Sequence, residues 1–300
     1  MKKILIAANR QAGKGRGAKV LQHAVHALQQ NGVVCEVLLS EYDGHLLQAL
    51  PARLTEKWDT IVALGGDGTL FQVINCCLHT PGFTTPLALL PAGTGNSFSK
   101  ELTGEAIESA WRKIISDQPT AIDVIHCRPH APAAGYPNGY YFITALGLGF
   151  VSEVTVNALR FKRLGVLAYA LSVLTSLIHL KTTHMKMVLD GETIVRENVF
   201  VIVCNSRYAG GNMKIAPGAR LDDGLMEVIV LNKVNRRTVI RAFPSVFSGT
   251  HVHHPNIEIF SGKKLHLEAD PVQILTPDGE VAGQTPATLT VQPQRLKFIL

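Results

Sequence analysis

Apolar and polar positions follow two different rhythms along the chain. Over the first 124 residues, short apolar runs alternate with segments whose apolar residues recur at helical spacing. The apolar runs predict strands at residues 4–8, 33–39, 61–64 and 87–90. Helical spacing is found at residues 20–28 and 106–115. Strand and helix alternation of this kind predicts an N-terminal open parallel α/β sheet covered by helices.

The rhythm changes after about residue 124, where strand patterns are joined by turns. Residues 184–205, "HMKMVLDGETIVRENVFVIVCN", read as two strands with Asp190-Gly191 as the hairpin turn. Further strand patterns, "GLMEVIVL", "IEIFSGKKLHLEA" and "ATLTVQP", follow. We therefore predict α/β plus β: a first domain over residues 1–124, and a second, mainly antiparallel β-sandwich domain over residues 125–300. The Pro- and Gly-rich residues 128–140 suit a loop near this boundary.

Three of the predicted strands of the first domain end in glycine-rich polar loops. These are "NRQAGKG" from Asn9, "GGDGT" from Gly65 and "PAGTGNSF" from Pro91. The carboxyl ends of parallel strands share one edge of a sheet, and glycines let backbone N–H groups approach an anion closely. Each loop alone could be an ordinary strand-to-helix turn, but together they predict a composite anion site. None matches GxxxxGK[ST] or GxGxxG, so neither a Walker-type NTPase nor a Rossmann dehydrogenase is indicated.

Composition limits the partners and the compartment. The 300 residues carry a formal net charge of +6 and a pI near 9.1, which favours acidic partners. Lys and Arg are scattered with few aromatic residues between them, so no nucleic-acid groove is expected. The five cysteines form no CxxC pair, and an odd number argues against a disulfide framework. With no signal-peptide pattern at the start, a reducing cytoplasm fits best.

The apolar stretch at residues 164–180, "LGVLAYALSVLTSLIHL", raises the question of a membrane span. It contains no Asp, Glu, Lys or Arg. However, it is shorter than the ~20 residues that a bilayer span normally needs. A buried or partly exposed helix is the favoured interpretation, with a spanning helix as the alternative.

Five stretches taken in order resemble the diacylglycerol kinase catalytic-domain family, which includes sphingosine kinases and the bacterial YegS type of lipid kinase. They are the loop from Asn9 to Gly13, "GGDGTL", "PAGTGNSF", residues 205–228 with "AGGN" and "DDGL", and "DGE" at Asp278 to Glu280. The resemblance spans nearly the whole chain. NAD kinases and phosphofructokinases share turns similar to "GGDGT", so the resemblance implies a first domain like theirs.

The resemblance implies an ATP site in the first domain and Mg²⁺ sites in both domains. The residues implied around ATP are Asn9, Ser40, Gly65, Gly66, Asp67, Gly68, Thr69, Leu70, Phe71, Gln72, Thr94 and Asn96. At the "DDGL" turn, one Mg²⁺ would be held by the side chain of Asp223 and the backbone carbonyls of Arg220 and Leu225. Asp67 and Asp123 would help to hold the catalytic Mg²⁺. Oxygen ligands are those that this hard cation prefers.

A carboxylate of the "DGE" motif would accept the proton of the acceptor hydroxyl. The resemblance favours Glu280 as this base, with Asp278 nearby, and the choice between the two is left open. Phosphoryl transfer needs such a group together with charge neutralisation and alignment. Asp278-Gly279 is also a good hairpin turn on local grounds.

The resemblance therefore predicts an ATP- and Mg²⁺-dependent lipid kinase, with a lipid-binding second domain. It would act on a lipid such as diacylglycerol as a cytoplasmic, peripheral membrane protein. Three departures, Arg10 for Pro, Gln72 for Glu and Ser97 for Asp, bear on metal affinity. The alternatives are a soluble-substrate kinase resembling NAD kinase, or a nucleotide-sensing protein without turnover. The acceptor lipid is left open, and so is a homodimer.

Overall fold

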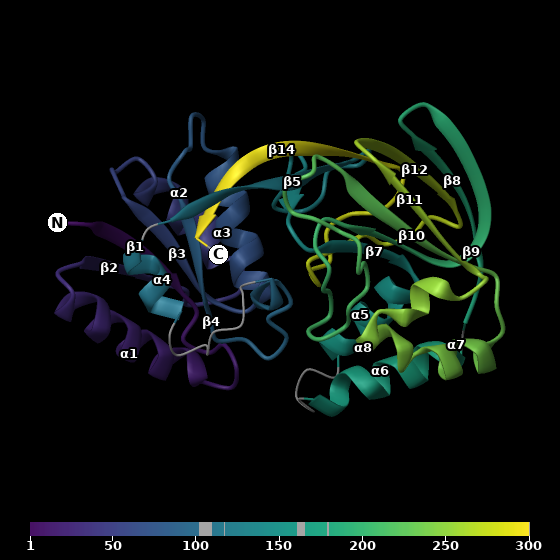
Figure 1. Ribbon diagram of the computed structural model, residues 1–300, viewed down its shortest axis with the longest axis horizontal. Coiled ribbons are helices and arrows are strands. Elements are labelled where there is room, and N and C mark those ends of the chain that lie inside the picture. Colours follow the sequence, from purple (N-terminus) through teal and green to yellow (C-terminus); the bar gives the residue numbers. More distant parts are fainter. Residues whose placement is uncertain (102–109, 117, 161–165, 179, 300) are drawn as a thin grey trace. The chain divides into compact units, whose positions relative to one another are not determined.

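The computed structural model describes residues 1–101, 110–116, 118–160, 166–178 and 180–299. The chain divides into two compact units, each of which is discontinuous in sequence (Figure 1). The first unit consists of Met1–Val124, Gly210–Asn212 and Pro293–Leu300. The second consists of Ile125–Ala209 and Met213–Gln292. The first boundary, at residue 124, lies where the spacing of apolar residues along the sequence changes. The chain then returns to the first unit twice, at Gly210–Asn212 and at Pro293–Leu300.

The first unit is built on a parallel sheet in the strand order β2-β1-β3-β4, with the end of β14 beside β4. Its elements are β1 Lys3–Ala8, α1 Arg16–Gln30, β2 Val34–Leu39, α2 His45–Arg53, β3 Thr60–Gly65, α3 Asp67–His79, β4 Leu87–Pro91, a 3-10 turn Phe98–Lys100 and α4 Ala110–Ser116. This sheet confirms the predicted open parallel α/β architecture. Of the helix expected at residues 106–115, residues 106–109 lie outside the described part of the chain.

Alternation along β1 explains how the helices cover this sheet. Ile4 and Ile6 on β1 belong to one buried cluster with Leu28 of α1 and Ile114 of α4. All six residues of β3 are buried, as is typical of a parallel strand that is covered on both faces. The apolar pattern thus places α1 and α4 on one face and leaves the strand ends for the loops.

The second unit is mainly antiparallel, as predicted. Its elements are β5 Pro119–Pro129, β6 Tyr140–Phe142, β7 Ala145–Gly149, α5 Phe150–Arg160, α6 Val166–Ile178, β8 Thr183–Leu189, β9 Glu192–Cys204, β10 Met226–Asn232, α7 Arg236–Ala242, α8 Ser245–Ser248, a 3-10 turn Thr250–His253, β11 Ile257–Gly262, β12 Lys264–Asp270, β13 Thr276–Pro277 and β14 Ala287–Ile299. Its strands run in the order β11-β10-β9-β8-β12-β14, and β7 pairs with β9 and β13. The predicted hairpin at Asp190-Gly191 joins β8 to β9, with Leu189 opposite Glu192.

Helices of the second unit share one buried cluster with its sheet. Val173 and Leu177 of α6 and Val239 of α7 are buried in a cluster with Val199 of β9. The apolar stretch at residues 164–180 is therefore a partly buried helix over Val166–Ile178, while residues 164, 165 and 179 lie outside the described part. Among the described residues, no helix combines the length and the apolar character that crossing a membrane requires.

Strand β5 passes from the first unit to the second between Val124 and Ile125, and strand β14 also belongs to both units. Ala287 to Thr290 pair with β12, whereas Phe298 and Ile299 pair in parallel with Leu87 and Ala88 of β4. The final strand of the first unit's sheet therefore comes from the last residues of the chain.

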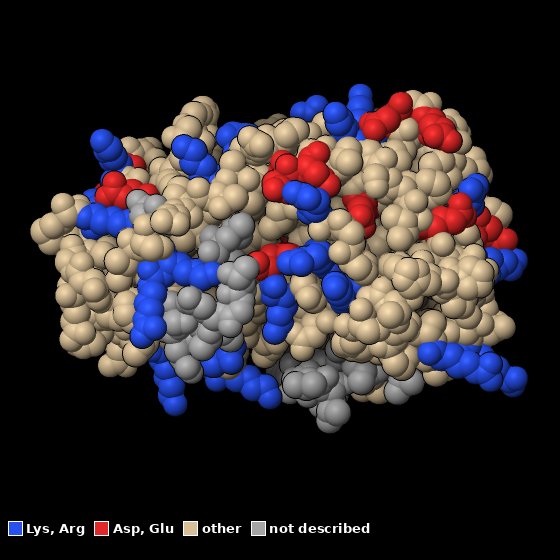
Figure 2. Space-filling view, viewed as in Figure 1, with Lys and Arg blue, Asp and Glu red and all other residues tan. Residues whose placement is uncertain are grey.

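Charged side chains are distributed over the surface in separate groups. On the face seen in Figure 2, Lys and Arg occur in several patches that are interrupted by acidic and uncharged residues. This distribution agrees with the scattered basic residues in the sequence.

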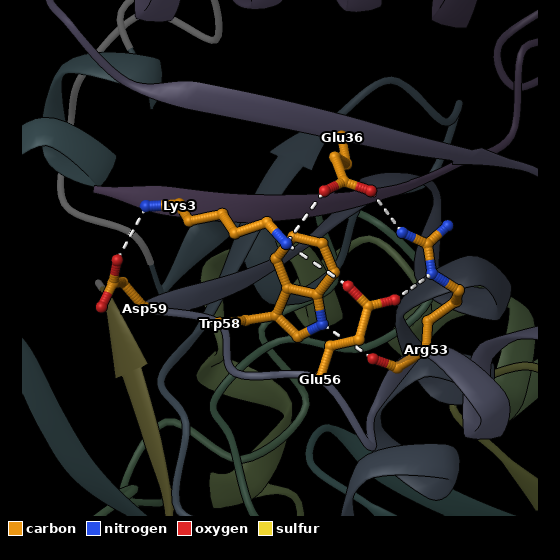
Figure 3. A network of polar contacts seen from close by, with 6 residues as sticks. All are labelled: Lys3, Glu36, Arg53, Glu56, Trp58 and Asp59. Atoms are coloured by element: carbon orange, nitrogen blue, oxygen red, sulfur yellow. Dashed lines mark hydrogen bonds and ion pairs between the residues drawn. The ribbon is translucent and has the colours of Figure 1, made fainter. Parts of the chain in front are cut away.

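A network of ion pairs lies near the amino ends of the strands in the first unit (Figure 3). Lys3 Nζ lies 3.0 Å from Glu36 Oε1 and 3.3 Å from Glu56 Oε2, and it stands 4.1 Å from the centre of the Trp58 ring. Arg53 contacts both glutamates from the end of α2. These pairs tie β1, β2 and α2 together at the edge of the sheet opposite the glycine-rich loops.

Candidate functional site

The glycine-rich loops contact one another at the carboxyl ends of β1, β3 and β4. A Cβ atom on Gly13, in the first loop, would lie 2.2 Å from the carbonyl oxygen of Ala92 in the third. One on Gly93 would lie 2.5 Å from Cα of Gly66 in the second loop. Only glycine permits such approaches, because real Cβ atoms do not come this close to backbone atoms. The three loops therefore form one continuous surface.

The second loop leads directly into helix α3. β3 ends at Gly65 and α3 begins at Asp67, with Gly66 between them at φ −101° and ψ −168°. This is extended backbone that any residue can adopt, so close packing against Gly93 is the reason for glycine here. The first N–H groups of a helix lack intrahelical partners and favour a negative charge. The start of α3 is thus suited to a phosphate group.

Ser97 joins the second and third loops to a distant part of the chain. Oδ2 of Asp67 accepts hydrogen bonds from the backbone N–H of Ser97 at 3.0 Å and from its hydroxyl at 3.1 Å. The same hydroxyl accepts a hydrogen bond from the N–H of Gly211 at 2.8 Å. The sequence predicted Asp67 as a site residue, but it did not indicate Gly211. Its only signal was the double glycine in "AGGN".

Two side-chain oxygens in these loops are buried without a donor. Among the described residues, neither Oδ1 of Asp67 nor Oδ1 of Asn96 has a hydrogen-bond partner. Asn96 has φ 49° and donates from Nδ2 to the Gly93 carbonyl at 2.9 Å, which directs its amide into the loop. Burial raises the pKa of Asp67, and the hydrogen bonds from Ser97 act in the opposite direction. Buried acceptors without donors are uncommon, and a hard cation or a donating ligand would satisfy them.

Other predicted nucleotide residues occupy the same edge in different ways. Oδ1 of Asn9 accepts a hydrogen bond from the Gln11 N–H at 3.0 Å, which shapes the first loop. Ser40 follows β2 and donates to the Tyr42 carbonyl at 3.1 Å. Thr94 is exposed, and Nε2 of Gln72 lies 3.4 Å from Oδ1 of Asp43.

Within α3, the predicted residues differ in what they can offer a ligand. Leu70 and Phe71 are buried in the interior, so only their backbone could contribute to a site. Thr69 is also buried, beside Gly65, and Gly68 lies in the first turn of the helix.

Arg16 is a feature of this edge that the sequence did not single out. Its Nη2 donates to the Gly93 carbonyl at 2.7 Å, from the first residue of α1. This contact fixes the third loop against the first. No local pattern distinguishes this arginine from a solvent-exposed one.

Asp123 is fully buried on β5, where Oδ1 accepts a hydrogen bond from the Gln294 N–H at 2.7 Å. Gln294 has φ 50°, so Asp123 stabilises an unusual backbone conformation in β14. This contact uses one carboxylate oxygen. The metal-binding role of Asp123 stays a prediction.

In the second unit, the Asp278 carboxylate fastens the "DGE" turn to the start of β7. It accepts hydrogen bonds from the backbone N–H groups of Ile143, Thr144 and Ala145 at 3.2, 2.9 and 3.2 Å. The Thr144 hydroxyl donates a further short hydrogen bond to it. Asp278 itself has φ 46°, and Gly279 has φ 84°. The turn is therefore held by side-chain contacts that a simple hairpin turn does not need.

Glu280 stands two residues further along the same turn. Its N–H donates to the Pro277 carbonyl at 2.8 Å, which closes the turn, and the residue is half-buried. Anchoring of Asp278 thus fixes the backbone from which the Glu280 carboxylate projects.

The "DDGL" turn carries an exposed carboxylate. Oδ1 of Asp223 accepts a hydrogen bond from the Leu225 N–H at 3.0 Å, while Arg220 pairs with Asp222 at 3.1 Å. Burial, and then the charge of Asp223, raise the pKa of the Glu227 carboxyl. Over the described residues, no group of three or more His, Cys, Asp or Glu side chains is arranged to hold a metal ion.

Two family matches cover the chain in succession. Residues 3–127 match the diacylglycerol kinase catalytic domain, and residues 143–300 match the YegS C-terminal NAD kinase beta sandwich-like domain. The chain belongs to the YegS-type diacylglycerol kinase family. The predicted family and fold class, including the sandwich-like second domain, are confirmed. As a member of this family, the chain is a lipid kinase.

Individual relatives support the same assignment. A diacylglycerol kinase of Mycobacterium tuberculosis is 29% identical over 307 residues, which cover 99% of this chain and 94% of that protein. A crystal structure from Bacillus anthracis, provisionally described as a diacylglycerol kinase, has a TM-score of 0.79 at 27% identity and covers 99% of this chain and 96% of that one. Yeast NADH kinase in complex with NADH has a TM-score of 0.52 at 10% identity over 99% of this chain and 82% of that one, which shows a shared fold alone.

Proposed function

We propose that this protein transfers the γ-phosphate of ATP to a hydroxyl group of a lipid such as diacylglycerol, with Mg²⁺ as cofactor. The observation that carries the proposal is the contact between three glycine-rich loops at one edge of the first unit's sheet. Their backbone N–H groups and the start of α3 suit the phosphates of a nucleotide. Diacylglycerol enters the proposal because the M. tuberculosis relative is named diacylglycerol kinase.

The phosphates would lie against the Gly66 to Thr69 backbone. Asn9 and Asn96 hold the neighbouring loops in shape through hydrogen bonds to main-chain groups. Arg16 contributes a positive charge beside the third loop while it is bound to the Gly93 carbonyl. Gly66 and Gly93 let these two loops pack backbone against backbone, with Oδ1 of Asn96 beside both glycines.

The buried Oδ1 of Asp67 fits a magnesium ion, because it is an oxygen acceptor without a donor among the described residues. When bound, Mg²⁺ would neutralise part of the negative charge on the transferring phosphate. Asp123 would assist through its carboxylate. At the second unit, Asp223 with the carbonyls of Arg220 and Leu225 would hold a further ion.

The two carboxylates of "DGE" have different proposed roles. Asp278 accepts hydrogen bonds from three consecutive backbone N–H groups and one hydroxyl, so it is fully engaged as a positioning residue. Glu280 is the proposed general base, which takes the proton of the lipid hydroxyl as its oxygen attacks the γ-phosphorus and ADP leaves.

A cytoplasmic location at the membrane surface is proposed from the substrate and from cysteine chemistry. The lipid acceptor resides in a bilayer, whereas ATP is dissolved in the cytosol. All five cysteines are free thiols, and four of them are buried. Such a chain suits a reducing compartment.

The test is transfer of γ-labelled ATP to a panel of diacylglycerol, sphingosine, phosphatidylglycerol and NAD. We expect a labelled lipid that depends on Mg²⁺. Glu280→Gln should lower kcat by about 10²- to 10⁴-fold with ATP affinity retained, because only the proton acceptor is lost. Glu192→Gln, at the exposed start of β9, is the matched control and should keep full activity.

Each negative result of this assay points to a different alternative. Transfer to NAD alone would establish the soluble-substrate alternative. Retained ATP binding without transfer to any acceptor would favour a nucleotide sensor. Full turnover by a folded Glu280→Gln variant would exclude Glu280 as the base while leaving the kinase assignment intact.

A further inference from the structure

Helices α7 and α8 carry an exposed stripe of arginine and large apolar side chains. Phe243 and Pro244 between them keep helical backbone angles, so the chain follows one helical path from Arg236 to Ser248. The outward residues are Arg236, Arg237, Ile240, Arg241 and Phe247, and we call them the α7–α8 stripe. Arg236 lies one helical turn before Ile240, and Phe247 lies two turns after it, so these three share one face. Arg237 and Arg241, one turn apart, border the same face. Ile240 and Phe247 remain 54% and 50% exposed.

The opposite side of the same helices is firmly attached to the second unit. Val239 is buried in the cluster that contains Val173 and Leu231. Asn235 caps α7, with Oδ1 accepting a hydrogen bond from the Thr238 N–H at 3.0 Å. The helix is thus fixed by its inner face and its cap. About half of the Ile240 and Phe247 side chains nevertheless stays in water, although the Phe247 ring also makes an edge contact with Phe243.

The segment of chain that carries the stripe has charges of one sign. Residues 233–249 contain four basic residues and no Asp or Glu. Lys233 is paired with Glu197 at 2.9 Å, but within the described part of the chain no acidic side chain pairs with the three arginines of the stripe. In Figure 2, basic side chains project at the lower right, where Figure 1 places α7, and the described atoms beside them on this face are uncharged. This surface favours a negatively charged and partly apolar occupant.

We propose that the α7–α8 stripe docks on a bilayer that contains anionic phospholipids. Arginines would contact lipid phosphates while Ile240 and Phe247 enter the boundary of the acyl chains, as interfacial helices do. The inference rests on the proposed lipid-kinase function, which requires the protein to meet a lipid in a membrane. A second copy of the chain is a poorer occupant, because a symmetric contact would bring arginines together, and like charges across an interface are unfavourable.

The first experiment measures binding of the full chain to vesicles of phosphatidylcholine with and without phosphatidylglycerol. Diacylglycerol and ATP are left out, so binding is measured apart from catalysis. We expect the wild type to prefer the anionic vesicles. Arg236→Gln/Arg237→Gln/Arg241→Gln should bind them roughly 100-fold more weakly, at about fivefold per arginine. The control, Lys263→Gln/Lys264→Gln, removes exposed charges from the β11–β12 turn and should lose far less affinity.

A second pair of variants tests the apolar part of the stripe. Ile240→Ser/Phe247→Ser should weaken binding to anionic vesicles, whereas Ile259→Ser, at an exposed isoleucine on β11, should not. Thermal melts establish that each variant is folded. Equal wild-type affinity for neutral and anionic vesicles, or unchanged binding by both folded stripe variants, would overturn the proposal. So would light scattering that shows a wild-type dimer converted to a monomer by the stripe substitutions.

Phosphate transfer to a short-chain diacylglycerol dissolved below its aggregation limit separates this inference from the proposed function. Stripe variants should keep wild-type turnover with this monomeric acceptor and lose it only with vesicle substrate. Stripe-dependent vesicle binding by a wild type that transfers no phosphate would refute the kinase proposal alone. If the wild type transfers phosphate fully and the stripe substitutions leave vesicle binding unchanged, this inference alone is refuted.

Discussion

Asp67 and Ser97 are joined by two hydrogen bonds to a single carboxylate oxygen, one from the backbone N–H at 3.0 Å and one from the hydroxyl at 3.1 Å. The contact fastens the loop after β4 to the start of α3. It also leaves the other Asp67 oxygen buried, without a donor among the described residues. Ser97 therefore links the two loops at a position where the resemblance to the family led us to expect an aspartate.

Ser97→Asp should destabilise the metal-free protein and make its stability depend on Mg²⁺. A second carboxylate at hydrogen-bond distance from Asp67 replaces an attraction by repulsion, at a cost of about 1–3 kcal/mol. If Asp67 binds Mg²⁺, the ion should raise the melting temperature of this variant more than that of the wild type. Ser97→Asn is the uncharged control of the same size. An equal Mg²⁺ response in all three proteins would argue against a metal at Asp67.

Gly66→Ala and Gly66→Val should weaken ATP binding in graded fashion. The backbone angles of Gly66 are open to any residue, but a Cβ there lies 3.3 Å from Cα of Gly93. A side chain that displaces the phosphate loses charge-assisted hydrogen bonds of about 1.5–3 kcal/mol each, which is about 10- to 100-fold in affinity. Calorimetric titration with ATP measures the effect. Normal affinity in a folded valine variant would contradict the assignment of this loop to phosphate.

Asp278→Asn should lower folding stability, in contrast to Glu280→Gln. An asparagine offers one acceptor oxygen to the donors at residues 143–145 and turns an amide group toward the rest. We expect a loss of about 1.5–3 kcal/mol in the free energy of unfolding. Glu280→Gln should change it by less than about 0.5 kcal/mol. Urea unfolding of both variants checks this difference, and a reversed order would contradict the positioning role of Asp278.

Lowering the pH should reduce the folding stability of the protein, because protonation of Glu258 on β11 weakens its contact with Arg196 on β9. Hydrogen bonds from Arg196, at 2.8 Å to each carboxylate oxygen, and then from Asn232, lower the pKa of Glu258 to about 2. Because the folded pKa lies below the unfolded value of about 4.3, this stabilisation is fully present above the unfolded pKa. It is lost as pH falls from there toward 2.

The pair is partly exposed, so the contribution should be about 1 kcal/mol or less. Urea unfolding of the wild type and Glu258→Gln across this pH window measures it. The variant should lose less stability on acidification than the wild type does. Parallel pH profiles for the two proteins would show that another carboxylate is responsible.

The edge of the sheet that carries the loops could be predicted because its signals are local. The apolar run at residues 61–64 is followed directly by Gly65, and the run at 87–90 leads through Pro91 and Ala92 to Gly93. Parallel strands have their carboxyl ends on one side. The turn at Asp190-Gly191 was equally readable, since both residues adopt positive φ there.

Contacts between residues that are far apart in the chain could not be predicted, because no local sequence pattern indicates them. Ser97 meets Gly211, which is 114 residues away, and Asp278 meets Thr144 at a separation of 134 residues. Locally, Asp278-Gly279 has the same pattern as a solvent-exposed turn. Its extra role exists only because β13 pairs with β7, a partnership that tertiary packing decides. The side chain of Asp123 likewise finds its partner, Gln294, only after β14 is in place.

The course of β14 determines which fragments of the chain can be expressed on their own. A fragment that ends at residue 124 would lack Phe298 and Ile299, which pair with Leu87 and Ala88. Its β4 would become an open edge, with unpaired backbone groups that invite association with other chains. The first unit therefore cannot be obtained by a single truncation. A gene that joins the last eight residues to residues 1–124 would restore this strand, and the product would still lack Gly210–Asn212.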